Sequence, residues 1–408
     1  MAHGLATDRS TRVATALRFY AAHWLAWPKR CGVFAVTSAG SLGDQAMTEA
    51  VRAYLIDHLQ QPCELVVLAG WQAPQLRRAC PIMTLDYGSP RRAALQLAGL
   101  SGRMRALGML GADVVDGRYE AESVLFRLAA LSTASMRHVP IAVLGASICE
   151  HPNANVMDTL RRASSLRFHA RDPVSAKRYW EGIGRAPILC ADLAFLLKPA
   201  LESATAREAL AWTLARRAGG GRVLGFNVNG LVAKQSEHAE AAYCSALRAH
   251  LRRHKDDAVL FLPHDLRPPP NGDIEILGRI HGRLREEFPN RVYVLSPPYY
   301  AWDIKALCGE LELVITGRMH LAVAALGMGT PSICTVYSGK FEGLFELFGL
   351  EDKGLLITPE DLPVPGLLNA KLDAAIGRAS GLRQAIAYAR PEVMCRAENN
   401  FAWLRERG

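Results

Sequence analysis

The sequence predicts an α/β protein in which two doubly wound, Rossmann-like domains face a central cleft. Short apolar runs alternate with helical patterns along most of the chain, which is typical of parallel sheets covered by helices on both faces. The alternation occurs in two series that meet near residue 200. A length of 408 residues also exceeds the size at which a single core keeps growing, so two domains are expected.

The first domain is expected to span residues 31–200. Its strands are predicted at Val33–Thr37, Leu65–Leu68, Val114–Val115, Ile141–Gly145, Leu166–His169 and Ile188–Cys190, and its helices at Gln45–Leu59, Glu122–Ser135 and Val174–Glu181. Residues 1–30 are expected to form a helical extension, because Leu17, Tyr20, Ala21 and Trp24 have helical spacing. That pattern fits packing onto the domain. It also fits an interfacial helix in peripheral contact with the inner membrane face.

The second domain is expected to span residues 201–380. Its strands are predicted at Val223–Val228, Ala258–Pro263, Val292–Leu295, Leu313–Thr316 and Ser332–Val336, and its helices at Glu237–His254, Asp273–Glu287, Ala301–Cys308 and Met319–Leu326. Residues 381–408 carry a last apolar-periodic stretch, which is long enough to cross back over the first domain. Ligands of such folds bind at the carboxyl ends of the strands, here in the cleft between the domains.

Composition narrows the function classes. The formal net charge of +9 favours anionic partners, but the basic residues are dispersed rather than gathered in a stripe, so no nucleic-acid partner is expected. The nine cysteines include no CxxC pair, and no histidine lies at metal-ligand spacing from any of them. This indicates buried, reduced thiols in a cytoplasmic protein without a structural zinc site, and no secretion signal is recognised.

The stretch GSLGD links the first predicted strand to the first helix. Its glycines, Gly40 and Gly43, allow a sharp turn with no Cβ at the cleft, and Ser41 lies between them. A turn from a strand into a helix can point backbone N–H groups at an anion. Asp44 begins the helix, where it is either a cap, an active-site base, or both.

Three charged or titratable residues follow neighbouring strands of the second domain. Arg318 and His320 open a helix after the strand Leu313–Thr316, and Lys340 follows the strand Ser332–Val336. Adjacent parallel strands end at the same edge of a sheet, so these residues can converge on an anion beside a helix N-terminus. Spacing alone equally allows two solvated cations and a core histidine.

Five segments, in order from about residue 32 to 350, resemble the polysaccharide pyruvyl transferase family. They are GSLGDQAM (Gly40–Met47), ARDPVSAKRY (Ala170–Tyr179), CADLAFLL (Cys190–Leu197), FLPHD (Phe261–Asp265), and the Arg-x-His helix start followed by GTPSI and by a lysine before LFGL. Each match is weak alone. Together and in this order they are specific for the family.

The resemblance implies a GT-B-like pair of domains and transfer of a pyruvyl group from phosphoenolpyruvate to two hydroxyls of a saccharide or lipid-linked saccharide. Phosphoenolpyruvate is then a substrate, and no metal or redox cofactor is expected. Arg171, Arg318, Lys340 and the Gly40–Gly43 turn would bind the donor's anionic groups, and His264 would contact substrate. His320 would shuttle the proton, and Asp44 would accept a proton from the sugar. Asp192 is interpreted as structural.

Two departures from the family pattern bear on the acceptor and on the reaction more than on the fold. Ser41 stands where the family usually has asparagine, and Asp113–Ser123 replaces a glycine run with charged, bulky residues. Two rival functions therefore remain open. One is a GT-B glycosyltransferase that uses a nucleotide sugar, and the other is a non-catalytic family member that binds a glycan.

Overall fold

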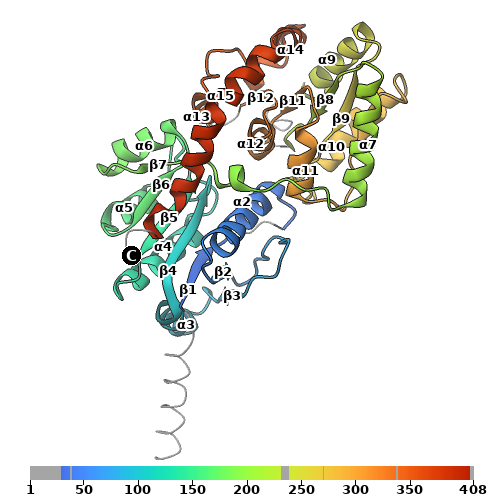
Figure 1. Cartoon of the computed structure of the whole chain (residues 1–408). Helices are drawn as coiled ribbons and strands as arrows, with labels where there is room; N and C mark the ends of the chain where they lie inside the picture. Colours follow the sequence, from blue (N-terminus) through green and yellow to red (C-terminus); the bar gives the residue numbers. More distant parts are fainter. Residues whose placement is uncertain (1–28, 37–38, 231–238, 270, 337–338, 405–408) are drawn as a thin grey trace, which may run out of the picture.

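The computed structural model describes residues 29–36, 39–230, 239–269, 271–336 and 339–404. Most of the expected N-terminal extension, residues 1–28, lies outside the described residues. The described chain forms two parallel β-sheets, each covered by helices, which lie side by side in Figure 1. Residues 29–200 form the first half of the molecule, and residues 201–377 form the second half.

The first half is built on a parallel sheet in the order β3-β2-β1-β4-β5-β6-β7. Its strands are β1 (Arg30–Phe34), β2 (Cys63–Leu68), β3 (Ile82–Leu85), β4 (Met104–Ala112), β5 (Ile141–Ala146), β6 (Arg167–Ala170) and β7 (Ile188–Leu189). Its helices are α2 (Leu42–Ala53), continued by a π-helical turn at Tyr54–His58, then α3 (Pro90–Arg103), α4 (Ala121–Ser135), α5 (Ala154–Arg162), α6 (Pro173–Ile183) and the 3-10 turn η2 (Leu193–Leu196).

The second half repeats the arrangement in the order β10-β9-β8-β11-β12-β13. Its strands are β8 (Val223–Phe226), β9 (Ala258–Phe261), β10 (Val292–Val294), β11 (Leu313–Thr316), β12 (Ser332–Thr335) and β13 (Leu356–Ile357). Its helices are α7 (Ala204–Ala218), α9 (Ala239–Arg253), α10 (Ile274–Arg285), α11 (Ala301–Cys308), α12 (Met319–Gly327), α13 (Phe341–Glu346) and α14 (Leu367–Gly377), with a 3-10 turn at Pro359–Asp361.

The two strand orders share a topological switch point. In each sheet the chain runs from the first strand to one edge of the sheet and then crosses to the other side of that first strand. The two strands at this switch point are β1 and β4 in the first sheet and β8 and β11 in the second. Crevices at the carboxyl ends of such strand pairs are the usual ligand sites of open α/β sheets. A ligand site is therefore expected at the loops that follow β1, β4, β8 and β11.

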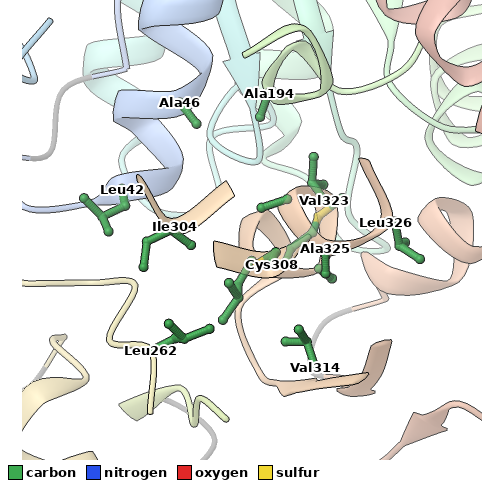
Figure 2. Packing of buried hydrophobic residues seen from close by; sticks show 14 of the residues in the cluster. Leu42, Ala46, Ala194, Leu262, Ile304, Cys308, Val314, Val323, Ala325 and Leu326 are labelled. Carbon is green, nitrogen blue, oxygen red and sulfur yellow. The ribbon is translucent and has the colours of Figure 1, made fainter. Parts of the chain in front are cut away.

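One apolar core joins the halves. Leu42 and Ala46 of α2 and Ala194 of η2 belong to the same buried cluster as residues of α11 and α12, and Figure 2 shows these side chains close together. Lys305 of α11 also donates hydrogen bonds from its ammonium to the carbonyls of Ala194 and Phe195, at 3.1 and 2.7 Å. The two halves are thus packed against each other through α2, η2, α11 and α12.

The C-terminal segment leaves the second half and packs on the first. The helix α15 (Ala379–Glu398), red in Figure 1, contacts η2. In the following 3-10 segment η4 (Asn399–Leu404), Asn400 donates to the carbonyl of Ala191 at 2.9 Å, and Phe401 stacks on Tyr54 with ring centroids 4.2 Å apart.

The structure differs from the sequence expectation around residue 110. The predicted strand Val114–Val115 is wrong, because these residues lie in a turn that follows β4. The sequence analysis missed β4 itself, whose Gly108 and Gly111 lower its strand propensity. Gly111 is required there, since a Cβ on it would lie 2.5 Å from the Cβ of Ala146. The flanking elements β3, α3 and α5 were also not predicted, nor were β13 and α14.

A further expectation concerns the cysteines. All nine cysteines are free thiols, and seven of them are buried. Among the described helices, none combines the length and apolar character needed to cross a bilayer.

Candidate functional site

A cavity of about 400 Å³ lies between the carboxyl ends of the two sheets. This is within the usual size range of small-molecule sites, about 300–1,000 Å³. Eight of the nine residues that the sequence analysis proposed line it: Ser41, Gly43, Asp44, Arg171, His264, Arg318, His320 and Lys340. Gly40 is not among the lining residues, and a Cβ on it would lie 3.1 Å from Cγ of Arg267. The structure therefore brings together residues that are up to 299 positions apart, while their chemical roles stay predictions.

The glycine turn connects the two halves. Gly40 has φ +94°, a left-handed conformation that favours glycine, and its carbonyl accepts a hydrogen bond from Leu266 N at 2.8 Å. Leu42 N donates to the carbonyl of His264 at 3.1 Å, and Ser41 caps α2 by accepting from Asp44 N at 3.4 Å. The amides of Leu42 and Asp44 already have protein acceptors. The turn thus offers fewer N–H groups to an anion than its sequence suggests.

Gly43 allows α2 to approach His320. A Cβ on Gly43 would lie 2.3 Å from Nδ1 of His320, which is closer than real Cβ contacts come. Asp44 is the next residue, in the first turn of α2, and lines the same cavity. The cap of α2 is Ser41, so Asp44 is not the helix cap that the sequence allowed.

His320 has a buried acidic residue behind it. Its Nε2 lies 3.5 Å from Oδ2 of Asp192, and the same oxygen accepts a hydrogen bond from Nη1 of Arg171 at 2.9 Å. Burial raises the pKa of Asp192, but His320 and Arg171 more than offset this and hold it well below its usual range. Asp192 is therefore ionised. It lies close enough to the imidazole to compensate the charge of its imidazolium form, so its interpretation as merely structural misses a contact with the site.

Arg171 is more buried than a simple donor-binding cation would be. Its side chain is 1% exposed, and its Nε donates to Oγ of Ser147 while Nη1 pairs with Asp192. Arg171 follows β6, and Asp192 precedes the turn η2. The Arg171 charge is thus largely used to hold Asp192 in place beside His320.

Arg318 is held by two aspartates. Its Nη2 and Nη1 lie 2.6 and 3.1 Å from the carboxylates of Asp273 and Asp265, respectively. It also occupies the N-cap position of α12, and Met319 and His320 in the first turn line the cavity. The positive end of the α12 dipole and the Arg318 guanidinium therefore face the same space, which favours an anion there.

Lys340 contacts the segment that departs from the family pattern. Its ammonium forms an ion pair with Asp113, donates to the hydroxyl of Tyr119 at 2.8 Å and lies 5.0 Å from the centre of that ring. Burial raises the pKa of Asp113, yet Lys340 and Arg171 hold it well below its usual range. The segment after β4 thus lines the cavity and ties the first half to Lys340 of the second.

His264 is a neutral imidazole in the cavity wall. Burial, together with the charges of His320 and Arg318, lowers its pKa well below its ordinary value. Neither ring nitrogen has a hydrogen-bond partner within the part of the chain that the structure describes. A buried imidazole without partners is costly, so this side chain is suited to donate to or accept from a bound polar group.

Arg127 of α4 lines the cavity and was missed by the sequence analysis. Its side chain stacks on Trp71, with 5.2 Å from its central carbon to the ring centre, and Nη2 donates weakly to Ser123 at 3.4 Å. Nη1 is buried and has no hydrogen-bond partner among the described residues. The sequence pattern could have indicated this residue. Arg127 is the single basic residue of α4 and shares the buried face of that helix with Val124, Leu128 and Leu131.

A family model described as "Polysaccharide pyruvyl transferase" matches residues 42–339, which is more than half of the chain. The chain belongs to this family. It is therefore a transferase enzyme, and its cavity residues from Asp44 to His320 fall within the matched region. Among curated proteins no relative matches.

Solved structures that resemble this family member have GT-B-type folds at low sequence identity. UDP-GlcNAc 2-epimerase from Neisseria meningitidis aligns with a TM-score of 0.57 and 11% identity over 93% of this chain and 100% of its own. A UDP-forming trehalose-phosphate synthase from Burkholderia xenovorans aligns with a TM-score of 0.51 and 13% identity over 93% of this chain and 99% of its own. A glycosyltransferase from Rickettsia africae aligns with a TM-score of 0.52 and 10% identity over 93% of this chain and 100% of its own. At these identities the likeness shows the fold.

Proposed function

We propose that the enzyme transfers the pyruvyl group of phosphoenolpyruvate to a saccharide or lipid-linked saccharide, forming a pyruvate ketal in envelope or exopolysaccharide synthesis. The observation that supports this most directly is the cavity in which His320, backed by Asp192, lies beside several cations. We place the enzyme in the cytoplasm, where phosphoenolpyruvate is made, with peripheral contact to the inner membrane face for a lipid-linked acceptor.

The donor carries a phosphate and a carboxylate, so it needs at least two positive sites. The first turn of α12 with Arg318 is one, since guanidinium and helix dipole act on the same space. Arg127 is the second, because its Nη1 is buried and lacks a protein acceptor among the described residues. Lys340 can rotate from Asp113 toward a stronger anion at the same rim.

The reaction requires one acid and one base. Protonation of the donor's CH2 carbon turns it into a methyl group and leaves a cationic carbon, which a sugar hydroxyl attacks. Phosphate then leaves with the C–O bond electrons, and a second hydroxyl attacks to close the ketal. Of the two hydroxyl protons, one replaces the proton used to form the methyl group and the other leaves with phosphate. No step calls for a metal or a redox cofactor.

His320 is the proposed proton shuttle, and Asp44 the proposed base for the attacking hydroxyl. Asp192 stabilises the imidazolium form of His320 while His320 holds the proton. Asp44 lies in the first turn of α2 and lines the same cavity as His320. His264, neutral and without partners in the described chain, is suited to bind an acceptor hydroxyl.

The test is phosphate release from phosphoenolpyruvate across a panel of acceptor glycans. His320→Gln should keep most donor affinity and lower turnover about 10²–10⁴-fold, the usual contribution of a positioned acid or base. Lys340→Ala is the comparison, because it removes charge from the same rim without removing the shuttle and should raise KM more than it lowers kcat. Turnover of His320→Gln within about tenfold of wild type would make Asp44 the residue to test next.

A nucleotide-sugar glycosyltransferase is the second candidate. It is favoured by the GT-B-type neighbours, one of which is described as bound to UDP-GlcNAc. Thermal stabilisation of the protein by phosphoenolpyruvate or by UDP-sugars separates the two functions, since the ligand that binds the folded state raises Tm. A glycan-binding protein without catalysis would bind a glycan and release no phosphate with any acceptor.

A further inference from the structure

A second cluster of ligand-type side chains lies away from the cavity. It comprises His250 of α9, His254 just beyond that helix, and Asp373 of α14, and the candidate ligand atoms of all three lie within 4.8 Å of one another. None of these residues lines the cavity between the halves. The two histidines are four positions apart, which places both rings on one face of a helix end.

His250 is arranged as a metal ligand would be. Its side chain is 1% exposed, and Nε2 lies 3.0 Å from Oδ2 of Asp257. A donor hydrogen bond to Asp257 leaves Nδ1 as the lone-pair nitrogen, and that buried atom has no hydrogen-bond partner among the described residues. A carboxylate that orients a histidine through its other nitrogen is the usual support of a metal-bound imidazole.

The supporting carboxylate is itself fixed. Arg222 pairs with Asp257 at 2.8 Å and also donates its backbone N–H at 3.0 Å. Burial raises the pKa of Asp257, but His250 and Arg222 hold it well below its usual range, so it is ionised. The contacts from Arg222 to Asp257 and from Asp257 to His250 thus fix the orientation of the His250 ring, and with it the position of Nδ1.

The geometry points to a zinc site formed by Nδ1 of His250, an imidazole nitrogen of His254 and a carboxylate oxygen of Asp373. Two imidazoles and a carboxylate are a ligand set that Zn²⁺ takes, with a water in the fourth position. Tetrahedral ligands about 2.0–2.1 Å from zinc lie about 3.3 Å apart. His254 is half-buried and Asp373 is partly exposed, so side-chain rotations can close that difference once Asp373 has left its ion pair with Arg253.

The site would fasten α14 to α9. These two helices pack together, and α14 leads into α15, which reaches the first half. Asp373 already forms an ion pair with Arg253, so zinc has to displace that arginine. This proposal departs from the sequence expectation of no metal, which considered cysteine spacings and overlooked the His250/His254 pair.

The experiment is calorimetric titration of the full chain with zinc chloride, together with Tm measured with and without zinc. Wild type should bind one equivalent and gain Tm, whereas His254→Gln and Asp373→Asn should each bind at least about tenfold more weakly. Cobalt(II) should give tetrahedral absorption bands in wild type only, and magnesium should have no effect.

Two further variants sharpen the result. Arg253→Gln should bind zinc more tightly than wild type, because it frees Asp373 from its ion pair. His151→Gln, at an exposed histidine of the first half, should bind as wild type does. Absence of zinc binding by wild type, or equal binding by wild type, His254→Gln and Asp373→Asn, would overturn the proposal.

Discussion

The basic residues at the cavity differ in how their charge is balanced. Arg171 is paired with Asp192, Arg318 with Asp265 and Asp273, and Lys340 with Asp113. Arg127 instead stacks on Trp71, and burial lowers its pKa although nearby Glu120 and Asp44 act in the opposite direction. A guanidinium that is buried and has no carboxylate contact is the cation most in need of a ligand.

Arg127→Met is therefore predicted to weaken donor binding. The variant loses a charge-assisted contact worth about 1.5–3 kcal/mol, so KM for phosphoenolpyruvate should rise about 10- to 100-fold with a smaller change in kcat. Removing a buried, uncompensated charge should leave Tm equal or higher. Steady-state kinetics and thermal unfolding check both statements. Arg118→Met, at an exposed neighbour outside the cavity lining, is the matched control. An unchanged KM would remove Arg127 from the donor site.

At the scale of elements, the approach of α2 to α12 is set by one glycine. The first turn of α2 lies against the His320 ring, and Gly43 has no room for a Cβ. Helix propensity alone would favour alanine there by about 1 kcal/mol. The glycine is thus explained by the position of the imidazole and not by the helix.

Gly43→Ala should lower kcat by displacing His320, with little change in KM. Tm should change modestly, because the gain in helix propensity opposes the steric strain. Gly278→Ala is the control, since Gly278 is in α10 with nothing within 4 Å of a new Cβ, and it should gain about 0.5–1 kcal/mol with unchanged kcat. If Gly43→Ala retains wild-type kcat, the contact with His320 does not matter for turnover.

Sequence reasoning predicted the parts of the fold that depend on local pattern. Apolar runs such as Leu65–Leu68 are strands, and residues that follow neighbouring parallel strands, such as Arg318 and Lys340, do line one cavity. Strands interrupted by glycine, such as β4, gave no clear period. The acidic partners could not be predicted either. Asp113 is 227 positions from Lys340, and only the docking of the halves brings them together.

For the whole molecule, the two halves share a core and are also linked by polar contacts at the cavity. The backbone of Gly40 and Leu42 bonds to the loop after β9, and Asp113 pairs with Lys340. A ligand in this cavity would therefore bind between surfaces that already touch, so changes in the pairing of Lys340 are coupled to the contact between the halves.

The stability of the whole fold should fall in acid because of buried histidines. His169 of β6 is fully buried, and burial lowers its pKa from 6.5 to about 4. The unfolded chain then binds a proton near pH 6.5 that the folded protein does not bind. Stability attributable to this residue is therefore unchanged at higher pH and is lost as pH falls from about 7 toward 4. His264, whose pKa is also lowered, acts in the same direction.

His169→Gln removes this titration and tests it. Between about pH 7.5 and about pH 5, wild type should lose about 2 kcal/mol of unfolding free energy through His169, and the variant should lose that much less. The variant starts from a lower stability at neutral pH, because its side chain no longer fits the site, so the quantity to compare is the slope of unfolding free energy against pH from denaturant titrations. His151→Gln, at an exposed histidine, should keep the wild-type slope. Equal slopes for wild type and His169→Gln would mean that His169 takes up its proton in the folded protein as readily as in the unfolded chain.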